Sequence, residues 1–210
     1  MQSKIWIFDL DDTLHNASAH IFPVMNRGMV QYIMDTLILD EAAAESLRQH
    51  YWRIYGATLK GLMRHHGTDP YHFLEETHQL ITLPEMVLQT KRLRHMLKSL
   101  SGRKVIFTNA PRSYALRVLD LLGIGDCFEL VFSVESAAFH AKPSVRGFQR
   151  LLKSINAKPS DCIMLEDTLS ALMTAKRLGM RTIWVTKQLH KPNFVDYRIN
   201  GVLALTHLKL

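Results

Sequence analysis

Short apolar runs recur along the chain, each about as long as a buried β-strand. From the second run onward, they alternate with stretches in which apolar residues return every three or four positions, as in amphipathic helices. The predicted strands are residues 4–8, 104–108, 130–134, 162–166 and 181–185. Strands that are apolar along their whole length favour a parallel sheet covered by helices on both faces. The pattern therefore predicts an α/β fold with a Rossmann-like, doubly wound parallel sheet.

The long segment between the first two predicted strands contains only helical patterns. Met25 and Met29, for example, fall on one face of a helix, and similar apolar stripes recur through the rest of the segment. The chain is long enough for one compact core with a smaller insertion. We therefore expect a Rossmann-like core made of residues 1–14 and 101–210, with residues 15–100 inserted as an all-helical segment after the first strand.

Polar residues follow four of the predicted strands. Because ligands bind at the carboxyl ends of the strands in open parallel sheets, these positions are candidates for a binding site. They are Asp9 and Asp11, Thr108 and Asn109, Lys142, and Glu166 and Asp167. Any one of these sets alone would also fit a helix cap, a turn or a solvated side chain. Their occurrence at four consecutive strand ends favours a shared site instead.

The side chains of this set suit phosphoryl transfer. Asp9, Asp11 and Asp167 offer hard oxygen ligands, which match a Mg²⁺ ion that also binds substrate phosphate. Lys142 and the Thr108 hydroxyl would bind that phosphate and neutralise its charge. One carboxylate can act as a covalent nucleophile, and a second, two residues on, can donate a proton to the leaving oxygen. A metal and a substrate that use them would explain why the acidic residues of "DLDD" are crowded together.

The chain is basic, with 26 Lys and Arg against 19 Asp and Glu and a formal net charge of +7. The basic residues are scattered along the sequence, so we expect no nucleic-acid partner. A basic surface also attracts anionic small molecules, and the expected partner is a small-molecule phosphate ester. The oligomeric state, monomer or homodimer, stays open.

No apolar run approaches the roughly 20 residues that a membrane-spanning helix needs, so we expect no membrane partner. The N-terminal stretch "MQSKIWIF" leads into a predicted strand instead of a secretory signal. Two cysteines, Cys127 and Cys162, are too few for a disulfide framework. These features predict a soluble, cytoplasmic protein.

Four segments resemble, in order, the motifs of the haloacid dehalogenase-like (HAD) hydrolase superfamily. They are "FDLDDTL", "IFTN", "KP" at 142–143 and "IMLED". The resemblance implies a Rossmann-like core with a helical cap of the subfamily I type inserted after the first motif. It also implies a Mg²⁺-dependent phosphohydrolase activity.

The resemblance assigns roles to single residues of the motifs. Asp9 would be the nucleophile and a metal ligand, and Asp11 the general acid/base and a metal ligand through its backbone carbonyl. The other implied roles are phosphate binding by Thr108, Asn109 and Lys142, metal binding by Asp167, and a place for Glu166 on the metal or next to one of its ligands.

The cap segment "YGATLKGLMRHH" resembles that of the pyrimidine 5'-nucleotidases, which implies pyrimidine nucleoside 5'-monophosphates such as UMP and CMP as substrates. His15 and the pair His65–His66 are candidates for contacts with the base or the sugar. Ala171 is a departure, because relatives in this subgroup commonly have an asparagine there, which would support Asp167.

Other functions stay open at this point. Asp11 argues against a dehalogenase, because a halide needs no proton donor whereas an alkoxide benefits from one. A phosphatase or phosphomutase for a small sugar phosphate or phosphoglycolate would use the same core residues. A non-catalytic module that binds a phospho-ligand is a further alternative. A receiver-type signalling domain fits less well, because it would gain nothing from a large helical insert.

Overall fold

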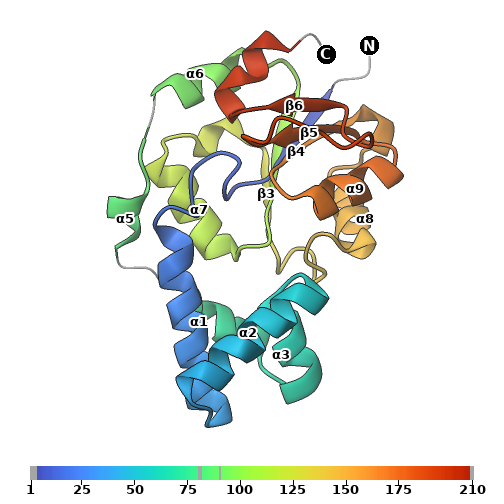
Figure 1. Cartoon of the computed structure of the whole chain (residues 1–210). Helices are drawn as coiled ribbons and strands as arrows, with labels where there is room; N and C mark the ends of the chain where they lie inside the picture. Colours follow the sequence, from blue (N-terminus) through green and yellow to red (C-terminus); the bar gives the residue numbers. More distant parts are fainter. Residues whose placement is uncertain (1–3, 80–81, 90, 209–210) are drawn as a thin grey trace. The chain divides into compact units, whose positions relative to one another are not determined.

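The structure, a computed structural model, describes residues 4–79, 82–89 and 91–208 (Figure 1). In these residues six strands form one parallel sheet in the order β3-β2-β1-β4-β5-β6. The strands are β1 (Ile5–Phe8), β2 (Arg103–Phe107), β3 (Leu130–Phe132), β4 (Cys162–Glu166), β5 (Arg181–Val185) and β6 (Tyr197–Ile199). This is a strand order of doubly wound, Rossmann-like folds, so the predicted fold class is confirmed.

The central position of β1 determines which loops meet. Phe8, the last residue of β1, pairs with Ile106 of β2 and with Leu165 of β4. Because the three strands are parallel and in this register, the segments that follow them leave the sheet at the same edge. Asp9, Thr108 and Glu166–Asp167 come from the ends of these strands or the segments after them, and Lys142 comes from the segment that follows β3.

The chain folds into two compact units, one of residues 1–16 and 87–210 and the other of residues 17–86. The first, which we call the sheet-bearing unit, also contains α6 (Lys91–Ser99), α7 (Arg112–Leu121), η1 (Gly125–Cys127), α8 (Val145–Ser154), η2 (Pro159–Asp161), α9 (Leu169–Arg177) and η3 (Val202–His207). The second, which we call the helical unit, contains α1 (Ile21–Leu37), α2 (Glu41–Tyr55), α3 (Thr58–His66), α4 (Pro70–His78) and α5 (Leu83–Met86).

The helix α6 lies in the sheet-bearing unit, whereas the sequence analysis assigned residues up to 100 to the insert. It packs against η1 and η3 and buries Leu93, Met96 and Leu97. An amphipathic stripe indicates only that one face of a helix is buried. The same spacing therefore fits packing against either unit. The assignment of a core and a cap to the two units stays a prediction.

Aromatic residues fill the sheet-bearing unit on one face of the sheet. The ring of Phe107 on β2 meets those of Phe132 and Phe148 edge to face, with centroid distances of 5.7 and 5.0 Å. All three are buried, together with Ile7 of β1 and Met164 of β4. Each such pair adds about 0.5–1.5 kcal/mol of stability beyond that gained by burying the rings.

The helical unit has well-defined helix ends. Asp40 before α2 and Asp69 before α4 accept hydrogen bonds from backbone amides of the helix that follows, at 2.8 and 2.9 Å. The α2 helix ends at Gly56, whose φ of 76° is left-handed. Gly61 on α3 faces the Tyr51 ring so closely that a Cβ atom would collide with it. Glycine at 61 therefore allows α2 and α3 to pack together.

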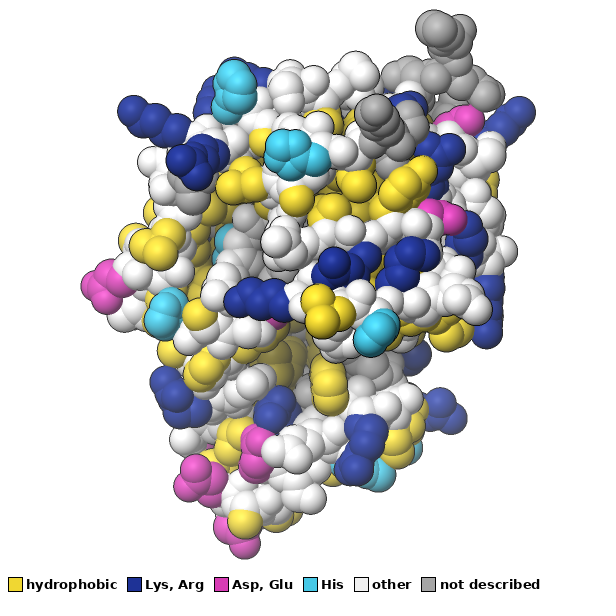
Figure 2. All heavy atoms as spheres, turned by 45° about the horizontal axis from the view of Figure 1, so that its top comes forward, with side chains coloured by type: hydrophobic (Ala, Val, Ile, Leu, Met, Phe, Trp, Pro, Cys, Tyr) yellow, Lys and Arg dark blue, Asp and Glu magenta, His cyan; other side chains and the backbone are white. Residues whose placement is uncertain are grey.

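The surface agrees with the scattered charge of the sequence. On the face drawn in Figure 2, Lys and Arg side chains are spread between exposed hydrophobic ones and do not form one dense cluster. In the described part of the chain, no helix has the length and apolar character needed to cross a membrane.

Candidate active site

Three neighbouring strands deliver the candidate residues to one edge of the sheet. Asp9 follows β1 directly, and its backbone amide donates to the carbonyl oxygen of Leu165 on β4 at 3.0 Å. Thr108 follows β2, and its amide donates to the carbonyl oxygen of Phe132 on β3 at 3.1 Å. Backbone hydrogen bonding therefore continues one residue beyond β1 and β2 and fixes the backbone positions of Asp9 and Thr108.

Lys142 joins two of the predicted carboxylates. Its Nζ donates to Asp9 Oδ1 and to Glu166 Oε2, both at 2.6 Å, and all three side chains are buried. The ammonium also lies 5.3 Å from the centroid of the Phe107 ring, a favourable cation–π distance. The loop, which has a cis Lys142–Pro143 peptide, thus brings its cation to the ends of β1 and β4.

Burial dominates the electrostatics of this group. It raises the pKa of Asp9 to about 7, with the charge of Glu166 adding to the increase and Lys142 opposing it. Burial likewise raises the pKa of Glu166 to about 7 against the opposing effect of Lys142. Burial alone would lower the pKa of Lys142, but Asp9 and Glu166 raise it, so the ammonium stays charged.

Asp9, Glu166 and Asp167 each offer a carboxylate oxygen, and these oxygens lie within 4.8 Å of one another. Burial raises the pKa of Asp167 as well. Three carboxylates beside one ammonium leave an excess of negative charge when all are ionised, which a divalent cation would compensate. An all-oxygen donor set is the kind that Mg²⁺ prefers, so these residues fit that ion. Asp11 was predicted to bind the metal through its backbone carbonyl. Its carboxylate forms hydrogen bonds with Tyr114 and His15.

Asn109 was predicted to bind phosphate, and its side chain contacts the backbone of Lys142. Asn109 Oδ1 accepts from the Lys142 amide at 2.7 Å, and Nδ2 donates to the Lys142 carbonyl at 3.0 Å. The neighbouring Thr108 is buried, and its Oγ1 accepts from the Ala110 amide at 3.0 Å. Asn109 therefore fixes the backbone position of the loop lysine, a role that the sequence analysis missed.

The Asp11 carboxylate accepts two hydrogen bonds on one oxygen. Tyr114 OH donates to Asp11 Oδ1 at 2.7 Å, and His15 Nε2 donates to the same atom at 2.9 Å. Burial raises the pKa of Tyr114 well above its usual range, and the charge of Asp11 adds to the increase. Asp12, next in the chain, has a left-handed φ of 59°, a backbone conformation that aspartate adopts more readily than most residues.

Most of the chain matches one known protein family. The model of a family described as haloacid dehalogenase-like hydrolase matches residues 6–185, which is most of the chain. The chain belongs to this family. The matched range includes all four segments that resemble the family's motifs.

Similar proteins include phosphatases. "Phosphate metabolism protein 8" of Saccharomyces cerevisiae is 25% identical over 221 residues, which cover 97% of this chain and 66% of the yeast protein. "Validoxylamine A 7'-phosphate phosphatase" of Streptomyces hygroscopicus subsp. limoneus is 25% identical over 197 residues, covering 87% of this chain and 85% of that enzyme. The crystal structure of YfnB from Bacillus subtilis bound to magnesium has a TM-score of 0.66 at 18% identity, covering 99% of this chain and 98% of that one.

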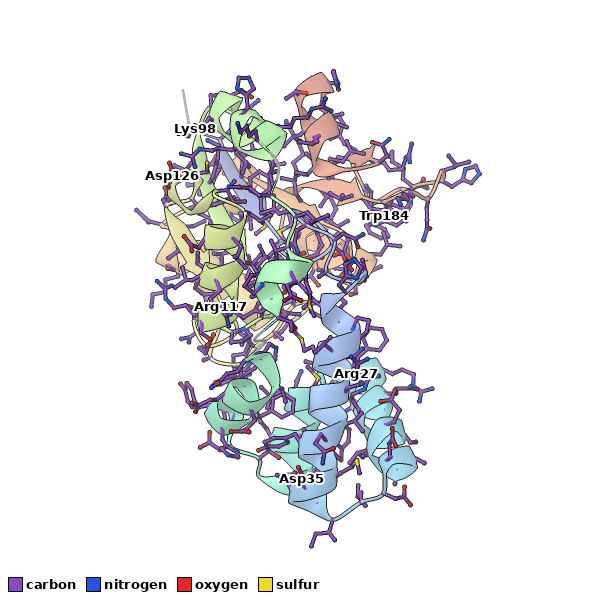
Figure 3. The ribbon with its side chains drawn as sticks, turned by 90° about the vertical axis from the view of Figure 1, so that its left-hand side faces the viewer. Arg27, Asp35, Lys98, Arg117, Asp126 and Trp184 are labelled. Carbon is purple, nitrogen blue, oxygen red and sulfur yellow. The ribbon has the colours of Figure 1, made fainter. Side chains whose placement is uncertain are left out.

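Within this HAD-family site, Trp184 holds the end of β4 in a way that no motif indicates. Trp184, labelled in Figure 3, lies on β5, the strand next to β4. Its indole Nε1 donates to the backbone carbonyl of Asp167 at 2.8 Å. Thr168 adds a second contact, because its amide donates to Glu166 Oε1 at 3.1 Å. Ala171, which stands where an asparagine was expected, is buried on α9. Among the described residues, Trp184 and Thr168 thus add to the contact that Lys142 makes with this acidic pair.

The histidines that were predicted to contact substrate already have partners. In the helical unit, His65 Nε2 lies 2.6 Å from the Tyr55 hydroxyl, and His66 Nε2 lies 2.8 Å from the Tyr51 hydroxyl. His15 belongs to the sheet-bearing unit and is bonded to Asp11. Contact of these residues with a substrate stays a prediction.

Proposed function

We propose that the chain is a Mg²⁺-dependent phosphomonoesterase that acts through an aspartyl-phosphate on Asp9. The observation that carries the proposal is the position of Lys142 Nζ, 2.6 Å from both Asp9 Oδ1 and Glu166 Oε2, at the edge where Asp167 also lies. A buried carboxylate next to a cation and an acidic metal-binding set is suited to attack a phosphate ester. The family and the named activities of its phosphatase members support the same reaction.

The metal would be held by Asp9, Asp167 and the backbone carbonyl of Asp11, with Glu166 on the metal or next to a ligand. When bound, Mg²⁺ supplies charge neutralisation for the phosphate and for the crowded carboxylates. Lys142 keeps Asp9 oriented and offers positive charge to the incoming phosphate. Thr108 Oγ1 accepts from a backbone amide, which leaves its O–H to donate to a phosphate oxygen.

The reaction has two halves that use the same two aspartates. A carboxylate oxygen of Asp9 forms a bond to phosphorus while the bond from phosphorus to the ester oxygen breaks, and Asp11 gives its proton to the leaving alkoxide. Asp11, now ionised, takes a proton from water as the water oxygen attacks phosphorus. The Asp9–phosphorus bond breaks, inorganic phosphate leaves, and both aspartates return to their starting states.

We extend the proposal to pyrimidine nucleoside 5'-monophosphates as substrates. Support comes from the segment 55–66, which resembles the cap segment of the pyrimidine 5'-nucleotidases. It forms the end of α2 and all of α3. The basic net charge of +7 suits an anionic substrate of this kind. One of the relatives above is named as a phosphatase for a different phosphate ester, validoxylamine A 7'-phosphate, so the substrate panel must include sugar phosphates and phosphoglycolate.

The test is phosphate release by purified protein with Mg²⁺, using UMP, CMP, AMP, sugar phosphates, phosphoglycolate and an aryl phosphate. We expect UMP and CMP to be turned over most efficiently, and Asp9→Asn to lower turnover about 1,000-fold or more. Asp12→Asn is the matched control, because asparagine tolerates the left-handed backbone at that position. It should retain activity within a few-fold of wild type.

Three results would change the proposal in different ways. Hydrolysis that survives Asp9→Asn, or a failure to trap ³²P-labelled phosphate on Asp9, would exclude the covalent mechanism. A preference for a sugar phosphate would keep the mechanism and remove the nucleotide. Release of phosphate from no substrate would favour a non-catalytic phospho-ligand-binding module.

A further inference from the structure

The Asp11 carboxylate is bonded asymmetrically. Among the described residues, both of its side-chain hydrogen bonds end on Oδ1, from Tyr114 OH at 2.7 Å and from His15 Nε2 at 2.9 Å. The two donors come from different parts of the sheet-bearing unit. His15 lies four positions after Asp11, and Tyr114 lies 103 positions away, in the first turn of α7. The oxygen Oδ2 is therefore left for exchange with other groups.

Both donors are held firmly. Tyr114 is 1% exposed, and the His15 side chain is 5% exposed. Within the described residues, His15 Nδ1 is buried without a hydrogen-bond partner. A hydrogen on Nδ1 would thus find no acceptor, whereas a hydrogen on Nε2 is accepted by Asp11 Oδ1.

The segment that leads from β2 to Tyr114 in the first turn of α7 also carries Thr108 and Asn109. It begins at the end of β2 and enters α7 at Arg112, whose amide donates to both carboxylate oxygens of Glu135, at 3.0 and 3.1 Å. One connection therefore places a phosphate-binding candidate and a donor to Asp11. This linkage couples the position of Asp11 to that of the phosphate site.

We propose that Tyr114 and His15 are positioning residues that fix Oδ1 of Asp11, so that Oδ2 is the atom that exchanges a proton with the leaving oxygen and then with water. The proposal rests on the phosphomonoesterase function above. Oδ1 can accept hydrogen bonds both when the Asp11 carboxyl group carries a proton on Oδ2 and when it is ionised. The two donors can therefore hold Oδ1 through both halves of the reaction. A fixed acid is most useful where the leaving group is poor, because that oxygen needs the proton most.

The test compares two substrates in single-turnover experiments: UMP, with an alkoxide leaving group, and p-nitrophenyl phosphate, whose leaving group departs readily without a proton. We expect Tyr114→Phe to slow leaving-group release from UMP about tenfold, a part of the about 10²–10⁴-fold that a general acid contributes. Release from p-nitrophenyl phosphate should change less than about threefold, and KM for UMP should stay near wild type.

The control variant is Tyr197→Phe, which removes a tyrosine hydroxyl from β6 in the same unit, away from the aspartates. It should leave both rates unchanged. At position 15, His15→Ala should reproduce the selective loss on UMP, and His15→Gln should recover part of it, because the glutamine amide keeps a donor. Thermal unfolding of each variant checks folding, and the His15 pair makes the same comparison if Tyr114→Phe does not fold.

Equal slowing on both substrates, or a change in KM alone, would overturn the proposal in favour of a purely structural role. Unchanged rates in Tyr114→Phe and His15→Ala would overturn it as well. These outcomes differ from failure of the proposed function, in which wild type itself forms no phosphoenzyme on Asp9; the positioning role would then fall with it.

Discussion

Side-chain hydrogen bonds are organised differently in the two units of the chain. In the sheet-bearing unit, Lys142 and Asp9 are ionisable, buried and 133 positions apart in the sequence. In the helical unit, Tyr51 and His66 are 15 positions apart, on consecutive helices. The first contact needs the assembled sheet, whereas the second needs only α2 and α3.

This difference separates two consequences of mutation. Contacts at the sheet edge connect groups that the proposed chemistry uses, so their loss should affect both stability and turnover. Contacts inside the helical unit connect neighbouring helices, so their loss should affect local stability first. The predictions below test that separation.

The largest effect is expected for Lys142→Met. Without the ammonium, Asp9 and Glu166 remain buried with no compensating charge from that side chain, and breaking such a buried pair costs about 3–5 kcal/mol. We therefore expect a lower free energy of unfolding in urea and a loss of phosphate release. Added Mg²⁺ should restore part of the stability, because it binds the folded acidic set.

Lys187→Met provides the control for this prediction. Lys187 is exposed, so its replacement should change the free energy of unfolding by less than about 0.5 kcal/mol. An unfolding free energy of Lys142→Met equal to that of the control would contradict a structural role for the bridge between Asp9 and Glu166.

The sequence is most informative where a pattern is local or where topology constrains it. The apolar runs predicted five strands, and parallel pairing then required the ends of β1, β2 and β4 to meet. The sixth strand was missed because Tyr197–Ile199 has three residues, of which only Ile199 is buried. A run this short does not differ from a loop in its hydrophobic pattern.

Contacts between distant segments could not be predicted in the same way. Tyr114 and Asp11 are 103 positions apart, and Trp184 and Asp167 are 17 apart on neighbouring strands. Their hydrogen bonds depend on strand register and on side-chain rotamers, neither of which leaves a periodic signal. The sequence therefore predicted which residues face the site edge, but not which neighbours hold them there.

An intermediate effect is expected for Trp184→Phe. The variant keeps an aromatic ring but loses the indole donor to the Asp167 carbonyl, 2.8 Å away. Loss of a group that orients a metal ligand typically weakens metal binding about 10–100-fold, and we expect the lower end of this range. The measurement is the Mg²⁺ concentration that gives half-maximal phosphate release, with turnover at saturating Mg²⁺ close to wild type.

Trp52→Phe is the matched control, since Trp52 is 62% exposed and lies in the helical unit. It should leave the Mg²⁺ requirement unchanged. A similar shift in both variants, or a loss in Trp184→Phe that saturating Mg²⁺ does not recover, would argue against support of Asp167 by the indole.

The smallest effect is expected in the helical unit, for Tyr51→Phe. The Tyr51 hydroxyl bonds to His66 in a partly buried setting, with Tyr51 itself buried, and losing one such bond costs about 1 kcal/mol. Tyr55→Phe removes the analogous bond to His65, which is exposed, so its cost should be under about 0.5 kcal/mol. Hydrogen exchange of the α2 and α3 amides measures both.

Turnover of an aryl phosphate, which has no nucleobase, should be the same in both variants and in wild type. A fall in that turnover parallel to the stability loss would mean that the local contacts of α2 and α3 are coupled to the sheet edge. Unchanged turnover with lowered protection of α2 and α3 would mean that the tyrosine–histidine pairs stabilise only their own unit.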